Sequence, residues 1–187
     1  MLPADVATGH TADDQAETVL LNILRGTGLD GLAVMGGPRH PILGLRRAET
    51  HALCATLGLQ PLDDPSNADP SFVRNRIRHE LLPLLDDIAE RDLVSLLTRL
   101  ASVAGDDLAV VDELASAIDP TDAKAIASAA PAVARRAIRR WLTRDGYPPD
   151  LASVERVLSV ARGDAIACEI VGGLEVRRSG QRLRVTE

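Results

Sequence analysis

The chain has 187 residues, a hydrophobic content of 45% and a net charge of -6, which is enough apolar material for one large domain or two small ones. Its two cysteines, Cys54 and Cys168, have neither a metal-ligand spacing nor the pattern of a disulfide framework, which favours a reducing compartment. The absence of a signal peptide pattern and of an apolar run of roughly 20 residues predicts a soluble cytoplasmic protein without a membrane partner.

A short buried strand is predicted over residues 2–9, followed by a helix over residues 12–25. Thr11 is a good N-cap, and Asp14 stands three positions later, which is the spacing of a capping box. The apolar residues of this helix are expected on one face, and Gly26 is expected to end it. That face is formed by Val19, Leu20, Ile23 and Leu24.

Three carboxylates and an imidazole, those of Asp13, Asp14, Glu17 and His10, lie within eight residues of this junction. The helical period places Asp14 and Glu17 near each other, on the edge of the helix away from its apolar face. Such a cluster suits Mg²⁺, or a cationic amine that loses a proton to a carboxylate or to His10. Alternatively, the acids merely interact favourably with the positive end of the helix macrodipole.

The next segments carry weaker signals. Residues 25–32 form a glycine-spaced loop in which backbone N–H groups and Arg25 could approach a phosphate, although a helix C-cap with ordinary turns explains the glycines almost as well. Ile42 and Leu43 suit a short edge strand. A helix is predicted from about residue 48 to residue 57, ended by Gly58.

A second acidic loop over residues 63–70 is rich in Asp, Asn and Pro, and precedes an apolar helix that opens with Arg74, Arg76 and Arg78. Three cations at a helix start oppose the helix dipole unless an anion compensates them. The candidates are substrate phosphates and the loop carboxylates of Asp63, Asp64 and Asp69, and we expect both to contribute.

Helical periodicity continues to residue 142, with breaks at Pro120 and Pro131, and a further helix is predicted over residues 151–162. Residues 131–187 hold 11 Lys+Arg against 7 Asp+Glu, whereas residues 1–130 hold 10 against 20. A basic C-terminal region is compatible with RNA binding, and equally with solvated helix faces. From residue 165 onwards the period changes to that of strands, with a hairpin turn over residues 171–174.

Several of these motifs together resemble the tRNA(Ile)-lysidine synthetases of the PP-loop ATP pyrophosphatase superfamily. The resemblance begins with GHTADDQAET at residues 9–18 and RGTGLDGLAVM at residues 25–35. It continues in the expected order through residues 41–43, Arg47, residues 64–69, Phe72 and residues 74–78. Several spaced motifs in order are far more specific than one short pattern.

The resemblance implies an α/β remnant, the C-terminal half of a PP-loop domain of the adenine-nucleotide-alpha-hydrolase type, over residues 1–80. A mostly helical tRNA-binding domain closed by a small antiparallel β flap would follow over residues 81–187. The Ser-Gly-Gly-x-Asp-Ser loop that binds the ATP pyrophosphate in this family is absent from the sequence. We therefore expect an N-terminally truncated member, a fragment, a split gene or a misplaced start, that does not bind ATP normally by itself.

The implied activity is the ATP-dependent ligation of lysine to C2 of the wobble cytidine of the CAU-anticodon isoleucine tRNA, through an adenylated intermediate. ATP and Mg²⁺ are the implied cofactors. The implied partners are that tRNA, lysine and a separate N-terminal PP-loop half, and a homodimer is a further expectation. The alternative is a non-catalytic or split fragment that serves as an RNA- or protein-binding module.

The resemblance also assigns roles to individual residues. Asp14 and Glu17 would grip lysine, and Arg74 and Arg78 would contact phosphate, which makes these four the catalytic set. The nucleotide would be bound by His10, Asp13, Arg25, Gly26 and Gly28, with Asp13 and Asp14 as ligands of Mg²⁺. The remaining substrate contacts would come from Arg47, Asp64, Asn67, Asp69, Asn75, Arg139 and Arg140.

Overall fold

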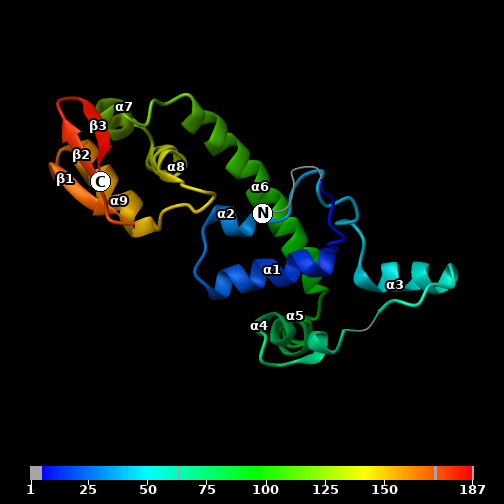
Figure 1. Ribbon diagram of the computed structural model, residues 1–187. Helices are drawn as coiled ribbons and strands as arrows, with labels where there is room; N and C mark the ends of the chain where they lie inside the picture. The colour runs from blue at the N-terminus through cyan, green and yellow to red at the C-terminus, as the bar shows by residue number, and fades with distance from the viewer. Residues whose placement is uncertain (1–5, 63, 171, 187) are drawn as a thin grey trace. The chain divides into compact units, whose positions relative to one another are not determined.

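The computed structural model describes residues 6–62, 64–170 and 172–186, and the chain divides into two compact units, Met1–Leu108 and Ala109–Glu187 (Figure 1). The long helix α6, Leu93–Ser116, supplies residues to both units. Among the described residues, no helix combines the length and the apolar character that crossing a membrane requires.

The described part of the N-terminal unit is helical and contains no strand. In this described part, seven helical elements come before α6, and the first part of α6 completes the unit. The seven are α1 Ala12–Leu24, α2 Leu29–Leu32, α3 Arg47–Thr56, the 3₁₀ turn η1 Pro65–Ala68, α4 Val73–Arg76, the π-helical segment η2 Ile77–Leu81 and α5 Leu82–Ala89. In this unit α1 packs against α2, α4 and η2.

Two predicted strands of this unit are not found. Residues 6–9 have no regular structure, and residues 2–5 of the same prediction lie outside the described residues. Ile42 and Leu43 lie in a turn, not in an edge strand. A strand needs a neighbour for its backbone groups, and the described residues of this unit supply only isolated contacts, such as the bond from the Thr8 N–H to the Arg39 carbonyl at 2.8 Å.

Helix α1 begins and ends where the sequence predicts. The Asp14 carboxylate accepts the backbone N–H of Thr11 at 2.8 Å, as in a capping box, and Gly26 takes the left-handed φ of +76° after the last turn. The predicted apolar face is only partly right. Val19 and Leu20 are buried, but 46% of Ile23 and 63% of Leu24 is exposed.

The core of the N-terminal unit lies against the first three turns of α1. The buried apolar residues are contributed by α1, η2, α5 and α6, and they are Ala12, Ala16, Val19, Leu20, Ile77, Leu82, Val94, Leu97 and Ala101. The helix predicted after Arg74 is present, but it widens into a π-helical turn at residues 77–81 before α5. Such turns are rare in proteins, and those that occur are often found at functional sites.

The C-terminal unit packs three helices against a small sheet. Helix α9, Leu151–Arg162, contacts α7, Ala123–Ser128, and α8, Pro131–Leu142, and also the strands β1 and β2. The strands β1 Ala167–Ile170, β2 Leu174–Ser179 and β3 Arg182–Thr186 form an antiparallel sheet in the order β1-β2-β3. The core between these helices and the sheet includes Ile126, Ile138, Val157, Leu158, Val176 and Leu183.

The sheet confirms the change of period seen in the sequence. Cys168 pairs with Val176, and Val176 with Val185, so that the apolar positions share the inner face of the sheet. The link between β1 and β2 includes Gly172 and Gly173, whose φ angles of +91° and +73° are those that tight hairpins require. The prediction of a mostly helical chain that ends in a small antiparallel sheet is confirmed, and a domain boundary at residue 80 stays a prediction.

Candidate functional site

The N-terminal unit is organised around the carboxylate of Glu17, whose side chain has 0% exposure. Arg78 donates Nε to its Oε1 at 2.7 Å and Nη2 to its Oε2 at 3.0 Å. Arg47 donates Nη2 to Oε1 at 3.0 Å, and Arg74 donates Nε to Oε2 at 3.1 Å. Both oxygens of Glu17 are therefore shared among three guanidinium groups.

Asp14 lies one helical turn before Glu17 and joins the same network. Its Oδ1 accepts Nη2 of Arg47 at 2.8 Å, and its Oδ2 accepts the backbone N–H and the hydroxyl of Thr11, each at 2.8 Å. Nη2 of Arg78 lies 3.8 Å from Oδ1. The two carboxylates and three arginines thus form one connected cluster, which we call the Glu17 cluster: Asp14, Glu17, Arg47, Arg74 and Arg78.

Asp13 binds a neighbouring pair of residues. Its carboxylate accepts the guanidinium of Arg46 at 3.2 Å and the backbone N–H of Arg47 at 2.7 Å, and so it fixes the start of α3. Arg46 also pairs with Asp92 at 2.8 Å. The beginning of α3 is thereby bonded to the first turn of α1.

These contacts decide the ionisation of the carboxyls. Burial would raise the pKa of Asp13, but the Arg47 backbone N–H and the Arg46 guanidinium outweigh it, and the pKa lies below its usual value. Burial likewise opposes ionisation of Asp14, but the two bonds from Thr11 and the charge of Arg47 lower its pKa. The bidentate bond to Glu17 raises the pKa of Arg78. Asp13, Asp14 and Arg78 are therefore held in their charged forms.

The local sequence explains how these side chains meet. Asp14 and Glu17 are three residues apart on α1, and Arg74 and Arg78 are four apart across α4 and η2, so each pair shares one helical face. Arg47 is the first residue of α3. Three segments separated by up to about 60 positions in the chain thus converge on one carboxylate.

A cavity of about 810 Å³ opens beside the Glu17 cluster. Volumes of this order accommodate ligands of nucleotide or amino-acid size. Four candidate site residues from the sequence line it, namely Asp14, Arg47, Asn67 and Arg78. The other lining residues are His51, Pro61, Leu62 and His79. The cavity makes this cluster the candidate site.

The acidic loop does not compensate the arginines as expected. The Asp64 carboxylate accepts the N–H of Ser66 at 2.9 Å, and that of Asp69 accepts the N–H of Ser71 at 2.8 Å, so both stabilise their own turns. Asp63 lies outside the described residues. The compensating charge for Arg74 and Arg78 comes instead from Glu17, which sequence spacing alone does not connect to them.

Asn75 and Asn67 fasten this loop to the helices. The Asn75 side-chain amide donates to the carbonyls of Ser66 and Asp69 at 2.7 and 2.8 Å. The carbonyl of Asn67 lies 3.2 Å from Nε2 of His79. Asn75 is buried, so the structure places it beneath the loop, whereas Asn67 reaches the cavity.

The residues expected around the nucleotide do not gather in one place. His10 lies before α1, where its Nδ1 is 3.0 Å from the Thr8 hydroxyl and 3.2 Å from Nδ1 of His40. Arg25, Gly26 and Gly28 follow the other end of α1, which is about 20 Å long at 1.5 Å per residue. The structure therefore separates His10 and Asp13 from the glycine-spaced loop.

Asp13 and Asp14 do not form a self-contained magnesium site. Among the described residues, no group of three or more His, Cys, Asp or Glu side chains is arranged to hold a metal ion. The oxygens of Asp14 already accept three hydrogen bonds, and those of Asp13 bind Arg46 and the Arg47 backbone. With these contacts the two carboxylates do not by themselves supply the oxygen-rich shell that Mg²⁺ requires.

Arg139 and Arg140 lie in the C-terminal unit, on helix α8. Arg140 donates Nη1 to the Asp112 carbonyl at 3.1 Å, and Arg136 binds the Asp112 carboxylate at 2.6 Å. The hydrogen bond from Arg136 lowers the pKa of Asp112. Asp112 therefore neutralises part of this arginine-rich face, and contact of Arg139 and Arg140 with tRNA stays a prediction.

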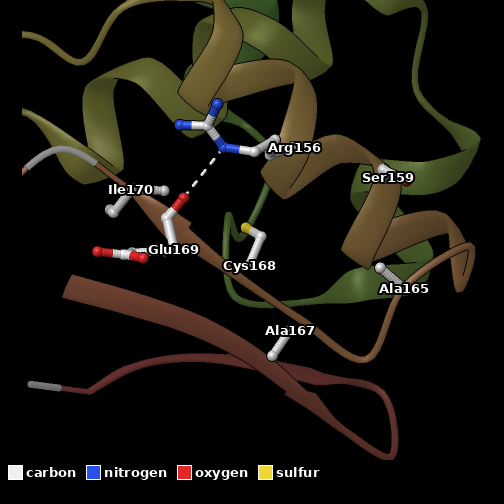
Figure 2. A pocket seen from close by; sticks show the side chains of 7 residues that line it. All are labelled: Arg156, Ser159, Ala165, Ala167, Cys168, Glu169 and Ile170. Atoms are coloured by element: carbon white, nitrogen blue, oxygen red, sulfur yellow. Dashed lines mark hydrogen bonds between the residues drawn. The ribbon is translucent and has the colours of Figure 1, made fainter. Parts of the chain in front are cut away.

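A second pocket, of about 660 Å³, lies between α9 and β1 in the C-terminal unit (Figure 2). Figure 2 shows the hydrogen bond from Arg156 Nε to the Glu169 carbonyl. Burial raises the pKa of the Cys168 thiol. No site residue expected from the sequence lines this pocket. Its lining lacks the convergent charges of the Glu17 cluster.

Sequence reasoning missed Arg46, His51 and His79. Arg46 directly precedes Arg47, and a charged residue at a helix start that opposes the dipole could have indicated an acidic partner. His51 lies one turn after Arg47, on the same face of α3. His79 follows Arg78 inside the π-helical turn, which no sequence signal predicted.

Comparison with known protein families divides the chain in a related way. Residues 4–85 match the family model described as a PP-loop domain, and residues 122–184 match the TilS substrate binding domain. The first match contains all five residues of the Glu17 cluster. The second contains α7, α8, α9 and most of the small sheet.

Curated relatives share this similarity along most of the chain. The tRNA(Ile)-lysidine synthase of Rhodococcus erythropolis is 41% identical over 152 residues, covering 75% of this chain and 47% of the relative. That of Nocardia farcinica is 41% identical over 173 residues, covering 84% and 54%, and that of Rhodococcus opacus is 38% identical over 201 residues, covering 96% and 61%. The chain belongs to the tRNA(Ile)-lysidine synthase family and spans about half the length of the curated relatives it matches.

Proposed function

We propose that this chain carries the lysine-transfer half of a tRNA(Ile)-lysidine synthase, a cytoplasmic ligase that uses ATP to join lysine to C2 of the wobble cytidine of the isoleucine tRNA with a CAU anticodon. The observation that carries the proposal is the convergence of Asp14, Glu17, Arg47, Arg74 and Arg78 beside a cavity of about 810 Å³. The names of the relatives and the two family matches support the reaction class.

The chemistry of the cluster supports this assignment. Transfer of lysine requires its amine to lose a proton and requires anionic phosphate to be stabilised near the reacting base. Asp14 keeps a carboxylate at the cavity wall, where it can hold the lysine ammonium, and Arg47 and Arg78 place guanidinium groups on the same wall. His51 and His79, which also line the cavity, are candidates to accept a proton.

The roles of ATP and Mg²⁺ are inferred from the family, because the described residues do not form a complete site for either of them. In this proposal His10 and Asp13 lie on the nucleotide side of α1, and Arg25, Gly26 and Gly28 border it from the other end. No step is assigned to Mg²⁺, because Asp13 and Asp14 are occupied by arginines. Asp64, Asn67, Asp69 and Asn75 form and hold the loop that closes one side of the cavity.

The test is an assay of lysidine formation with labelled lysine, ATP, Mg²⁺ and the isoleucine tRNA. It is run on this chain alone and with a PP-loop half that carries Ser-Gly-Gly-x-Asp-Ser supplied in trans. We expect incorporation only with the added half. Incorporation by the chain alone would show that other residues bind ATP, and none in either sample would favour an RNA- or protein-binding module.

Asp14→Asn tests the assigned residue within that assay. The amide retains an oxygen that can accept the Thr11 N–H, so the helix start is preserved while the charge is removed. We expect lysine transfer to fall by at least a hundredfold with adenylation still detectable. Asp87→Asn, an exposed carboxylate on α5, is the matched control, and equal loss of both steps in Asp14→Asn would move that residue to the nucleotide.

The tRNA contact is tested separately in the C-terminal unit. Arg139→Ala combined with Arg140→Ala should weaken tRNA binding and reduce the slope of log K against log salt by about 2, one for each phosphate that is no longer neutralised. Filter binding between 50 and 200 mM salt, as rough limits, measures the slope. An unchanged slope would make this helix face an ordinary solvated surface.

A further inference from the structure

The side chain of Glu17 is the most enclosed polar group of the candidate site. Its exposure is 0%, and its two oxygens receive four hydrogen bonds from Arg47, Arg74 and Arg78. Glu17 does not line the cavity, whereas Asp14, one turn away, does. A substrate in the cavity therefore meets the arginines before it meets Glu17.

Arg47 and Arg78 line the cavity and have side-chain donors that no described residue accepts. Within the described part of the chain, the side chain of Arg47 donates only through Nη2, and that of Arg78 only through Nε and Nη2. Each guanidinium carries five N–H donors in a fixed plane. Both residues line the cavity, with 28% and 22% of their side chains exposed, so the remaining N–H groups are available to a ligand there.

The charge balance points the same way. Asp14 and Glu17 contribute two negative charges to the cluster, and Arg47, Arg74 and Arg78 contribute three positive ones. Within these five residues the excess positive charge lies on the arginines and favours an anionic group beside Arg47 and Arg78, while Asp14 remains the carboxylate of the cavity wall. Arg74 also donates Nη2 to the Asp14 carbonyl and the Thr18 hydroxyl, and so it binds the cluster to the backbone and side chains of α1.

We propose that Glu17 is a positioning residue, which touches no substrate but holds Arg47 and Arg78 so that their free N–H groups bind an anionic group in the cavity. The anionic group is a phosphate of a nucleotide or tRNA, or the α-carboxylate of lysine. This role replaces direct contact between Glu17 and the lysine ammonium, which would require the carboxylate to release its arginines. The inference rests on the proposed function, because it concerns the same cavity.

The test uses this chain with inorganic pyrophosphate as the probe, and the arginine Nε–H resonances as the readout. We expect pyrophosphate to shift the resonances of Arg47 and Arg78. Glu17→Gln, which keeps the shape but removes the charge and places an NH₂ group against the arginines, should weaken pyrophosphate binding at least tenfold. The control is Glu80→Gln, which removes an exposed ion pair with Arg76 in the same helical region and should leave binding unchanged.

Competition identifies the source of the anion. If lysine displaces pyrophosphate and cadaverine, which lacks the carboxylate, does not, the site binds the α-carboxylate. If neither displaces it, the site binds phosphate. If cadaverine binds as tightly as lysine, and Glu17→Gln abolishes cadaverine binding, Glu17 contacts the ammonium and the inference is overturned.

A second variant covers the case in which Glu17→Gln does not fold. Arg78→Lys keeps the positive charge but lacks the planar fork that binds both oxygens of Glu17 and directs further N–H groups in a fixed plane. Pyrophosphate binding should therefore fall at least tenfold in Arg78→Lys while the helical signal is retained. Unchanged binding by folded Glu17→Gln or Arg78→Lys would contradict the inference.

The binding test can fail separately from the proposed function. Pyrophosphate binding requires neither turnover nor tRNA, so absence of lysidine formation leaves the role of Glu17 intact if the arginine resonances respond as expected. Conversely, lysidine formation by a Glu17→Gln variant at the unaltered rate, lysine KM and pyrophosphate affinity would reject the positioning role and leave the proposed function standing.

Discussion

The two units use charged residues in opposite ways. In the N-terminal unit three arginines converge on Glu17, a carboxylate without exposure, and the apolar core beside it is small. In the C-terminal unit a larger apolar core lies beneath the sheet, and pairs such as Arg177–Glu175 and Arg182–Asp119 have 40–57% of their side chains exposed. Burying charge is costly and exposing it is not, so the N-terminal arrangement is the one that a binding task explains.

The largest expected effect comes from a substitution in the apolar core of the C-terminal unit. Leu158→Ala empties a position with 1% exposure in the core of the C-terminal unit, and should lower the free energy of unfolding by about 3–4 kcal/mol. Trp141, the single tryptophan of the chain, packs against this core and reports its unfolding by fluorescence. Leu151→Ala, at a position with 62% exposure on the same helix, should cost below about 0.5 kcal/mol.

The next largest effect comes from removing the central carboxylate of the Glu17 cluster. Glu17→Ala leaves three guanidinium groups together without their shared carboxylate, and should cost about 2–3 kcal/mol. This is less than for a fully buried pair, because 22–40% of the arginine side chains is exposed and water can reach them. Urea unfolding followed by the helical signal measures it.

Fluorescence of Trp141 in the same experiment sharpens the comparison. We expect the Glu17→Ala transition seen by circular dichroism to move to lower urea while the Trp141 transition moves less, because Trp141 belongs to the C-terminal unit. Equal movement of both transitions would show that the two units unfold as one and would refute the contrast.

Acid should weaken the N-terminal unit through Asp13 and Asp14. Burial opposes ionisation, but the bonds from Thr11, Arg46 and Arg47 leave the pKa of both carboxyls below the usual 3.8. A carboxyl with a lowered pKa stabilises the folded state above its unfolded pKa, and that stability is lost as the pH falls through the folded pKa. The free energy of unfolding should therefore decrease as the pH falls below about 4, and less steeply in Asp13→Asn.

Asp119 provides the contrasting carboxyl in the C-terminal unit. Hydrogen bonds from Thr121, helped by Arg182, lower its pKa to about 2 although the group is exposed. Carboxyl chemical shifts measured between pH 1.5 and 5, as rough limits, should show this low midpoint. A midpoint near 3.8 would mean that the Thr121 and Arg182 contacts are absent in solution.

The smallest effect concerns the exposed pairs. Arg135→Ala removes an ion pair with Glu155 between α8 and α9, and should change the free energy of unfolding by at most about 1 kcal/mol, falling further in high salt. Urea unfolding of the Trp141 signal at low and high salt measures it. A loss as large as that of Glu17→Ala would contradict the view that these pairs contribute little.

The sequence by itself determined several features that depend on neighbours within a few positions. The capping box of Thr11 and Asp14, the end of α1 at Gly26 and the hairpin at Gly172 and Gly173 follow from side-chain spacing and from glycine's access to positive φ. The family resemblance followed from motif order, and it placed Asp14, Glu17, Arg74 and Arg78 in one site before their contacts were known.

Only the tertiary structure decided which charges are paired and which are buried. The helical period put Glu17 on an open edge of α1, and composition offered Asp64 and Asp69 as partners for the arginines. In the fold, those acids stabilise their own turns, and Arg47, Arg74 and Arg78 cover Glu17 from segments 30 to 61 positions away. Electrostatic pairing depends on distance in space, which spacing along the chain encodes only within a helix or a turn.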